Sequence, residues 1–314
     1  MKKSDQNNKP VTRPAHYVGV VFVVALIGIG VFAWRSLTPR LPAIGGMSGL
    51  NMNPSTTDNS SMAGRDMGAA KNLAQLEGDL HALSVGEDGS LFYGQHAGVQ
   101  ISKDGGQTWS TAAGGGDAMG MGVNSGKVFL AGHDFFAVST DSGQTWNKPG
   151  VGNLPGTDIH GFAVADNGWL YANLAGGGLY RSTDDGANWT FATQATTRAY
   201  KIVAATGAPP VLYALTQDQG LIRSSDGGTN WKPIKVSGQP LSIAVEASGA
   251  ILISLSNSSI LRSSDGGTTW EQSKAPEAFV LLAVNPKNSE NIYGVSETGQ
   301  VYASLNAGQT WRGR

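Results

Sequence analysis

Histidine, methionine and aspartate recur at matching positions in three segments of this chain. The segments share the pattern D-x-H/M-A/G-x-S/G/A-V, and its two polar positions hold Asp79 and His81, Asp117 and Met119, and Asp158 and His160. Imidazole, thioether and carboxylate groups bind transition-metal ions, and imidazole with carboxylate also suits polar organic ligands. The three segments therefore mark candidate ligand-binding or metal-binding residues.

Two further histidines occupy equivalent positions. His96 and His133 each lie six residues before the serine of a repeated turn motif. Where later segments align with the D-x-H/M pattern, the place of the histidine is taken by Tyr200, Leu241 and Val280. The polar residues are therefore confined to the first half of the repeats.

The turn motif occurs six times and reads S-x-D-x-G-x-T/N-W, with asparagine replacing aspartate in the last copy. Its aspartate position holds Asp104, Asp141, Asp184, Asp226, Asp265 and Asn306, and its tryptophan position holds Trp109, Trp146, Trp189, Trp231, Trp270 and Trp311. Successive tryptophans are 37, 43, 42, 39 and 41 residues apart, which is close to the period of a four-stranded propeller blade. The sequence therefore predicts an all-β propeller of about six blades.

Each repeat contains four short strand-like runs. In the third repeat they are residues 159–164, 170–173, 179–182 and 189–192, separated by turns rich in glycine and aspartate. An aspartate in a tight turn accepts hydrogen bonds from backbone amides, and glycine supplies the positive φ. We expect the motif to lock the turn between the third and fourth strands, with its tryptophan packed on the blade.

The direction of the strands places the polar residues. In an antiparallel blade the first strand starts at the end where the second strand finishes, and the turn between the third and fourth strands lies at the opposite end. We therefore expect one face, away from the turn motifs, to hold His81, His96, His133 and His160 with Met119 and the three aspartates. His16, beside the apolar N-terminal run, is separate from this group.

Three interpretations of this polar group stay open. The histidines are packing residues inherited through blade duplication, each bonded to an aspartate of a neighbouring blade. Alternatively, they bind a small molecule or a protein, or they hold copper or zinc through imidazole, carboxylate and thioether donors. No other cofactor is indicated, and no residue is assigned as catalytic.

Composition narrows the function classes. Glycine contributes 44 of 314 residues, which is typical of short strands joined by tight turns. From residue 66 onward, 15 basic and 21 acidic residues give a net charge of −6, so there is no electrostatic reason to expect nucleic-acid binding. The chain has no cysteine, which excludes disulfides, thiolate catalysis and zinc sites built on sulfur.

A membrane anchor is predicted near the N-terminus. Residues 17–34 form an uncharged run of 18 residues, just long enough to cross the hydrocarbon core as a helix. Four basic residues precede this run and two follow it, so residues 1–16 should be a cytoplasmic tail. A cleaved signal peptide is the alternative, although no small-residue cleavage site follows. Residues 35–75 are predicted to be a flexible linker rich in Gly, Ser and Met, and residues 76–314 an extracytoplasmic propeller at the cell membrane.

The turn motif resembles the Asp-box, or BNR, repeat. Similar repeats occur in sialidases, sortilin-type propellers, photosystem II stability and assembly factor-like proteins, and bacterial proteins labelled glycosyl hydrolases. In these families the Asp-box lies in peripheral turns, so the resemblance implies a propeller and assigns no catalytic residue. The chain does not resemble a sialidase in its other motifs. It lacks the R-I-P motif, and Arg181, Arg223 and Arg262 immediately precede Asp-box serines instead of forming a recognisable carboxylate-binding triad.

The first functional hypothesis is a non-enzymatic propeller that binds a protein partner or assists assembly of a membrane complex. The alternative is a glycan-binding or glycosyl hydrolase-like protein, because the sequence does not exclude a pair of facing carboxylates. The second alternative is an extracytoplasmic protein that binds copper or zinc. A deep pocket with convergent carboxylates would favour the hydrolase, a flat apolar patch the scaffold, and clustered imidazoles the metal.

Overall fold

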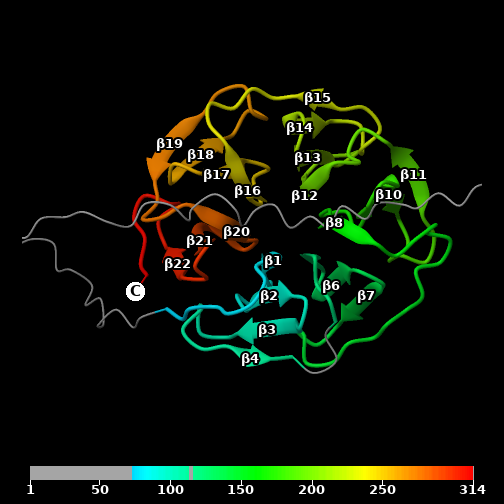
Figure 1. The fold of residues 1–314 in the computed structure, drawn as a ribbon, viewed down its shortest axis with the longest axis horizontal. Helices are drawn as coiled ribbons and strands as arrows, with labels where there is room; N and C mark the ends of the chain where they lie inside the picture. The colour runs from blue at the N-terminus through cyan, green and yellow to red at the C-terminus, as the bar shows by residue number, and fades with distance from the viewer. Residues whose placement is uncertain (1–72, 113–115, 314) are drawn as a thin grey trace, which may run out of the picture. The chain divides into compact units, whose positions relative to one another are not determined.

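Six antiparallel sheets surround a central axis in the computed structural model, which describes residues 73–112 and 116–313 (Figure 1). The all-β propeller with six blades is therefore confirmed. Within those described ranges, no helix has the length and apolar character needed to cross a membrane. The predicted span at residues 17–34, the tail before it and most of the predicted linker lie outside the described residues.

The strands of each blade follow one another both in sequence and in space. Blade 1 contains β1 (Ala82–Val85), β2 (Leu91–Gln95), β3 (Gly98–Ser102) and β4 (Ser110–Thr111). Blade 2 contains β5 (Gly120–Asn124), β6 (Lys127–Gly132) and β7 (Phe135–Ser139). Blade 3 contains β8 (Ile159–Val164), β9 (Leu170–Leu174), β10 (Gly178–Ser182) and β11 (Thr190–Thr193).

The second half of the ring repeats the arrangement. Blade 4 contains β12 (Ala199–Ala205), β13 (Val211–Thr216), β14 (Gly220–Ser224) and β15 (Lys232–Pro233). Blade 5 contains β16 (Pro240–Val245), β17 (Ile251–Leu255), β18 (Ser259–Ser263) and β19 (Glu271–Lys274). Blade 6 contains β20 (Phe279–Asn285), β21 (Asn288–Ser296) and β22 (Val301–Ser304).

Blades 2 and 6 differ from the expected four strands. Their fourth position is an isolated bridge, between Val138 and Asn147 in blade 2 and between Ala303 and Arg312 in blade 6. In the third repeat, by contrast, all four predicted runs form strands whose ends differ from the prediction by at most one residue. The outermost strand is the one that contributes least to the core, and its length varies most.

The hydrophobic core lies between adjacent blades. Each of six buried clusters joins two neighbouring sheets, so every sheet is covered on both faces. This explains why a strand such as β17 is buried along its whole length and does not alternate between apolar and polar residues. The first strand of every blade contacts the first strands of both neighbours and thereby lines the central axis.

Residues 73–76, here called the clasp, join the two ends of the ring. Leu76 donates its backbone N–H to Gly299 of blade 6, and Ala74 donates to Gly106 in the Asp-box of blade 1. The Leu73 and Leu76 side chains are buried in the cluster between blades 6 and 1. Residues 73–75, which the sequence assigned to the linker, thus pack against both terminal blades.

The Asp-box of blade 5 shows how the motif works. Ser263 Oγ donates to Asp265 Oδ1 and accepts the backbone N–H of Gly267, both at 2.8 Å. The other donors to Asp265 include the Thr269 hydroxyl at 2.6 Å and the Thr269 amide at 2.9 Å. These hydrogen bonds, with those of Thr269 the largest, lower the pKa of Asp265 to about 2. Gly267 adopts a φ of 92°, which a side chain would strain.

The last copy keeps this geometry without the charge. Asn306 Oδ1 accepts the hydroxyl of Ser304 and the backbone N–H of Thr310, at 2.9 Å each. Its amide Nδ2 then donates to the Thr310 hydroxyl at 2.8 Å, the reverse of the direction in the aspartate copies. An acceptor at this position, and not a negative charge, is therefore what the turn requires.

Replacing Ser263 with alanine should lower the free energy of unfolding by about 1–3 kcal/mol. The Ser263 side chain is buried, and its loss leaves the Gly267 N–H without its acceptor. Equilibrium unfolding in urea measures this change. The neighbouring Ser264, which is exposed, provides the control, since Ser264→Ala should change stability by less than about 0.5 kcal/mol. Equal effects of the two substitutions would contradict the locking role.

Candidate metal centre

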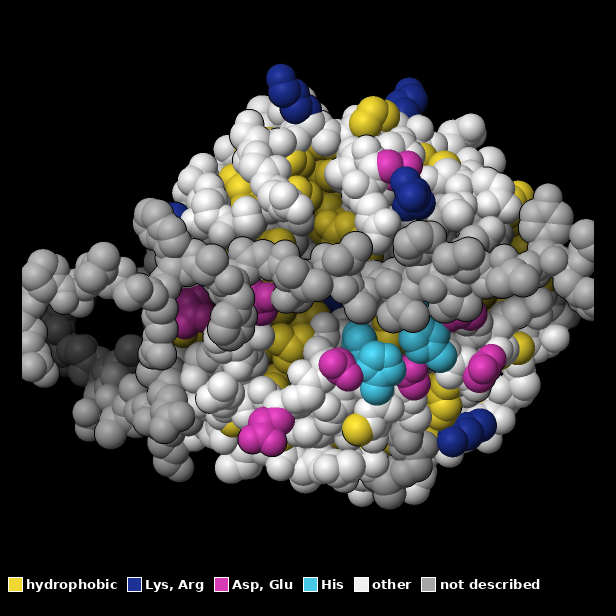
Figure 2. All heavy atoms as spheres, viewed as in Figure 1, with side chains coloured by type: hydrophobic (Ala, Val, Ile, Leu, Met, Phe, Trp, Pro, Cys, Tyr) yellow, Lys and Arg dark blue, Asp and Glu magenta, His cyan; other side chains and the backbone are white. Residues whose placement is uncertain are grey.

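A group of histidine and acidic side chains lies on one face of the propeller (Figure 2). His81 precedes β1 and His160 lies in β8, while His96 and His133 directly follow β2 and β6. The register of blade 1 pairs Val85 at the end of β1 with Leu91, and Leu91 with the Asp-box serine. The histidines therefore lie at the strand ends remote from the Asp-boxes.

The first three-residue group, here called the blade 1 triad, consists of Asp79, His81 and His96. His81 Nε2 and Asp79 Oδ2 each lie 2.8 Å from His96 Nδ1. The two imidazole rings are nearly perpendicular, at 83°, with centroids 4.2 Å apart. Three potential ligand atoms from one blade thus converge on a single point at the surface.

The second group, here called the blade 3 triad, takes His133 from blade 2 and Asp158 and His160 from blade 3. His133 Nε2 lies 3.1 Å from His160 Nε2 and 3.4 Å from Asp158 Oδ1. His160 Nε2 lies 3.0 Å from the same carboxylate oxygen. This triad repeats the composition of the first, two imidazoles and one carboxylate, across a blade interface.

Asp117 lies between the two triads. Its Oδ2 is 2.6 Å from His133 Nδ1 and 3.9 Å from His96 Nε2, and the two imidazole rings stack with centroids 5.9 Å apart. Its other oxygen, Oδ1, is buried and has no hydrogen-bond partner among the described residues. A hydrogen bond from His133 Nδ1–H to Asp117 leaves the Nε2 lone pair directed at the blade 3 triad.

The lowered pKa of His81 favours metal binding, because it favours the neutral imidazole. Burial, followed by the neighbouring His96, lowers the pKa of His81 below its usual value, although Asp117 and Asp79 act in the opposite direction. A neutral imidazole keeps the lone pair that a metal ion requires. The three carboxylates of the group have no lysine or arginine within salt-bridge distance among the described residues.

Met119, the remaining sequence-predicted residue, lies among the residues that line the central channel. In the second half of the ring, Tyr200 occupies the position of His81 and donates its hydroxyl to the carbonyl of Pro240. The polar group is therefore built from blades 1 to 3 alone.

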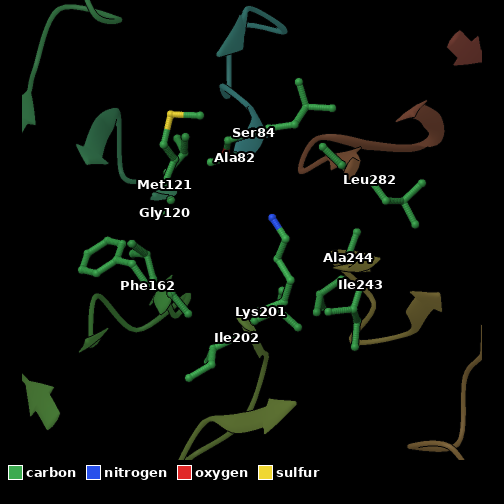
Figure 3. A pocket seen from close by; sticks show the side chains of 18 of the residues that line it. Ala82, Ser84, Gly120, Met121, Phe162, Lys201, Ile202, Ile243, Ala244 and Leu282 are labelled. Carbon is green, nitrogen blue, oxygen red and sulfur yellow. The ribbon is translucent and has the colours of Figure 1, made fainter. Parts of the chain in front are cut away.

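The central channel contains a residue that the sequence analysis missed. Lys201 of β12 points into this channel of about 200 Å³, beside Ser84 and Ala82 (Figure 3). Its ammonium donates to the backbone carbonyl of His81 at 2.5 Å, and burial lowers the pKa of Lys201 to about 8. An alignment of the blades could have revealed this lysine, because the other five blades have no charged residue at the equivalent position of the first strand. They have Ala82, Gly120, Gly161, Ser242 and Leu281 there.

The three arginines beside the Asp-boxes do not converge. Arg262 pairs with Glu246 of its own blade at 2.6 Å. Arg181 and Arg223 lie over aromatic rings of blades 3 and 4 respectively. All three side chains are half-buried, and these partners lie in three different blades.

Comparisons with known proteins agree with the fold. A family model described as the DUF6242 beta propeller domain matches residues 115–241, and the BNR/Asp-box repeat matches residues 100–111. No curated protein matches the sequence. Among solved structures, the three described next are 16–19% identical to this chain, and such likeness establishes the fold alone.

Three of these structures show the range of propellers involved. YCF48 bound to D1 peptide is 19% identical, with a TM-score of 0.51 over 78% of this chain and 87% of that chain. Virginiamycin B lyase from Staphylococcus aureus is 17% identical, with a TM-score of 0.53 over 77% and 85%. A GH74 enzyme from Niastella koreensis is 16% identical, with a TM-score of 0.56 over 77% of this chain and 46% of the enzyme. By its repeats and its fold, this chain is an Asp-box β-propeller.

Proposed function

We propose that this chain is a non-enzymatic binding propeller whose face holds divalent ions of a late first-row transition metal, zinc or copper. The observation that carries the proposal is the pair of triads, each with three ligand atoms within 4.8 Å of one another. Two imidazoles with one carboxylate are a common donor set for such ions.

The separations between donors fit a metal ion. Zinc–nitrogen bonds of about 2.0 Å at tetrahedral angles place neighbouring donors about 3.3 Å apart. In the blade 3 triad the three separations are 3.0, 3.1 and 3.4 Å. In the blade 1 triad, His96 Nδ1 lies 2.8 Å from both His81 Nε2 and Asp79 Oδ2, so a small outward movement would admit an ion there.

Two ions can be bound at the same time. The blade 1 triad and the blade 3 triad share no residue, so neither excludes the other. A third possible group, His96, Asp117 and His133, takes one histidine from each triad and would hold a single ion in their place. We favour two ions, because Asp117 then serves as the outer carboxylate that orients His133.

Each triad leaves a coordination position open. Zinc with three protein ligands takes a fourth from water or another molecule. If a protein partner supplies this fourth ligand, the partner binds through the metal ion, and its binding then depends on the metal. The propeller in YCF48, which has the same fold, was solved with a bound peptide, and this supports a protein partner here.

The proposed location follows from the N-terminal sequence. Residues 17–34 would anchor the chain in the cell membrane, with the propeller on the extracytoplasmic side. There the propeller would act as a scaffold for a protein partner or membrane complex. A test by protease protection in sealed vesicles should show a propeller accessible only from the extracytoplasmic side.

Metal titration of the full-length chain in mild detergent tests the proposal. After removal of metal with a chelator, calorimetric titration with Zn(II) and Cu(II) should show tight binding of two ions. The His81→Ala/His160→Ala variant removes one ligand from each triad and should lose this binding. His16→Ala is the matched control, because the sequence places His16 beside the apolar N-terminal run and not in the propeller repeats, and this variant should bind as the wild type does.

Two results would overturn the metal assignment. One is the absence of binding by the wild-type chain. The other is equal binding by the double variant, which would assign the histidines to packing between blades. Circular dichroism of each variant verifies that the β-structure is retained, so a loss of binding is not confused with a loss of fold.

A further inference from the structure

Lys201 crosses the channel from one side of the ring to the other. It belongs to blade 4, and the carbonyl to which its ammonium donates belongs to His81 in blade 1. These blades lie opposite each other in the six-bladed ring, and the Lys201 side chain extends into the middle of the channel (Figure 3). The side chain thus presents a positive charge on the axis of the propeller.

The ammonium lacks the partners that a buried charge normally has. It carries three N–H donors, and the hydrogen bond to His81 is the one contact that the described residues provide. No aspartate or glutamate is among the residues that line the channel. Lys201 is half-buried, so its unpaired ammonium is only partly hydrated, and a bound anion would offset this loss of hydration.

Apart from Lys201, most residues that line the channel are of apolar or small type, while backbone groups contribute polar surface. Phe162, Ile202 and Ile243 belong to the channel wall, but their side chains are buried between the blades. Small residues such as Ala82, Ser84 and Gly120 therefore leave room beside the ammonium (Figure 3). The volume of about 200 Å³ exceeds that of several water molecules at about 30 Å³ each. A ligand that matches this lining has one anionic group and a short apolar stem.

We propose that the channel binds a small carboxylic acid, with the carboxylate on the Lys201 ammonium and the apolar stem against the strand walls. The charge-assisted hydrogen bond provides selectivity for the anion, and burial of the stem contributes further affinity. This site lies inside the ring and uses none of the side chains of the two triads. It therefore does not depend on the proposed metal function.

The carboxylates of the two triads, together with Asp117 between them, disfavour an anion in the channel, and bound metal ions would reverse that effect. Asp79, Asp117 and Asp158 carry three negative charges, whereas two divalent ions bring four positive charges. The metal-loaded face is then net positive, so a carboxylate in the channel should bind more tightly to the loaded protein. By linkage, the carboxylate should raise metal affinity by the same factor.

Comparison of butyrate with butyramide tests the proposal. The two probes share an apolar stem and differ in charge, and calorimetry on the full-length, metal-free chain should show butyrate binding at least about tenfold more tightly. Lys201→Met should abolish this preference. Lys232→Met, which removes an exposed lysine of β15, should preserve it.

A second variant keeps the test decisive if Lys201→Met does not fold. Ser84→Leu narrows the channel without changing the ammonium, and it should weaken butyrate binding while the chain still binds zinc. Equal binding of the two probes, or no binding of either, would overturn the proposal. So would a retained preference for butyrate in Lys201→Met. Zinc titration of the same samples separates these outcomes from failure of the metal function.

Discussion

Replacing Asp117 with alanine should weaken zinc binding at both triads by about 10–100-fold while the stoichiometry stays at two ions, as expected for an outer-sphere carboxylate. Asp117 Oδ2 holds His133 Nδ1 at 2.6 Å and faces His96 Nε2 at 3.9 Å. Without it, both imidazoles lose the carboxylate that orients them. The larger loss is expected at the blade 3 triad, because the bond to His133 is the shorter one.

Calorimetric titration of Zn(II), with Co(II) absorption spectra as a check on coordination, measures the effect. Asp117→Asn should give an intermediate loss, since an amide oxygen still accepts the His133 N–H. Asp218→Ala provides the control, because Asp218 is exposed in the turn between β13 and β14. If the wild type binds one ion and Asp117→Ala binds none, the ion lies on the group of His96, Asp117 and His133 instead.

Replacing Phe279 with alanine should lower the free energy of unfolding by about 3–5 kcal/mol. Phe279 is fully buried between blades 5 and 6. Its ring centroid lies 4.8 Å from that of Trp311 and 5.4 Å from that of Tyr302. A Cβ atom on Gly294 would lie 2.3 Å from the Phe279 ring, so the glycine provides the space that the ring fills.

Equilibrium unfolding in urea, followed by tryptophan fluorescence and by circular dichroism, measures the loss. Agreement between the two probes is needed before a single free energy is assigned. Phe191→Ala is the matched control, because Phe191 is 48% exposed on β11. A loss of less than about 1.5 kcal/mol for Phe279→Ala would show that the blade interface closes around the missing ring.

The sequence was sufficient for the architecture because every repeat carries its own local signal. The Asp-box aspartate, glycine and tryptophan determine one turn per blade, and their period gives the number of blades. Strand direction alone then brought His81, His96, His133 and His160 to one face. None of these inferences requires a knowledge of how neighbouring blades pack.

The features that the sequence did not predict depend on details that the alternation of side chains along a strand does not reveal. Lys201 follows an irregularity of register between Ala199 and Lys201, and such a bulge changes the direction of a side chain relative to simple alternation. The central position of Asp117 depends on ångström-scale distances between two blades. Regular pairing of the fourth strand is lost in blades 2 and 6, and in blade 2 the Asp-box itself is complete and gives no signal of this loss.

The clasp has a consequence for biosynthesis. Gln75 pairs with Gln300. The clasp is therefore synthesised early, but its hydrogen-bond partners in blade 6 are translated more than 220 residues later. Closing so long a loop is entropically unfavourable, although the cost grows only slowly with length. Until blade 6 is complete, Leu73 and Leu76 lack the Val301 side of their cluster. Nascent and truncated chains would therefore expose this apolar surface to chaperones and proteases, and only a fully translated ring would conceal it.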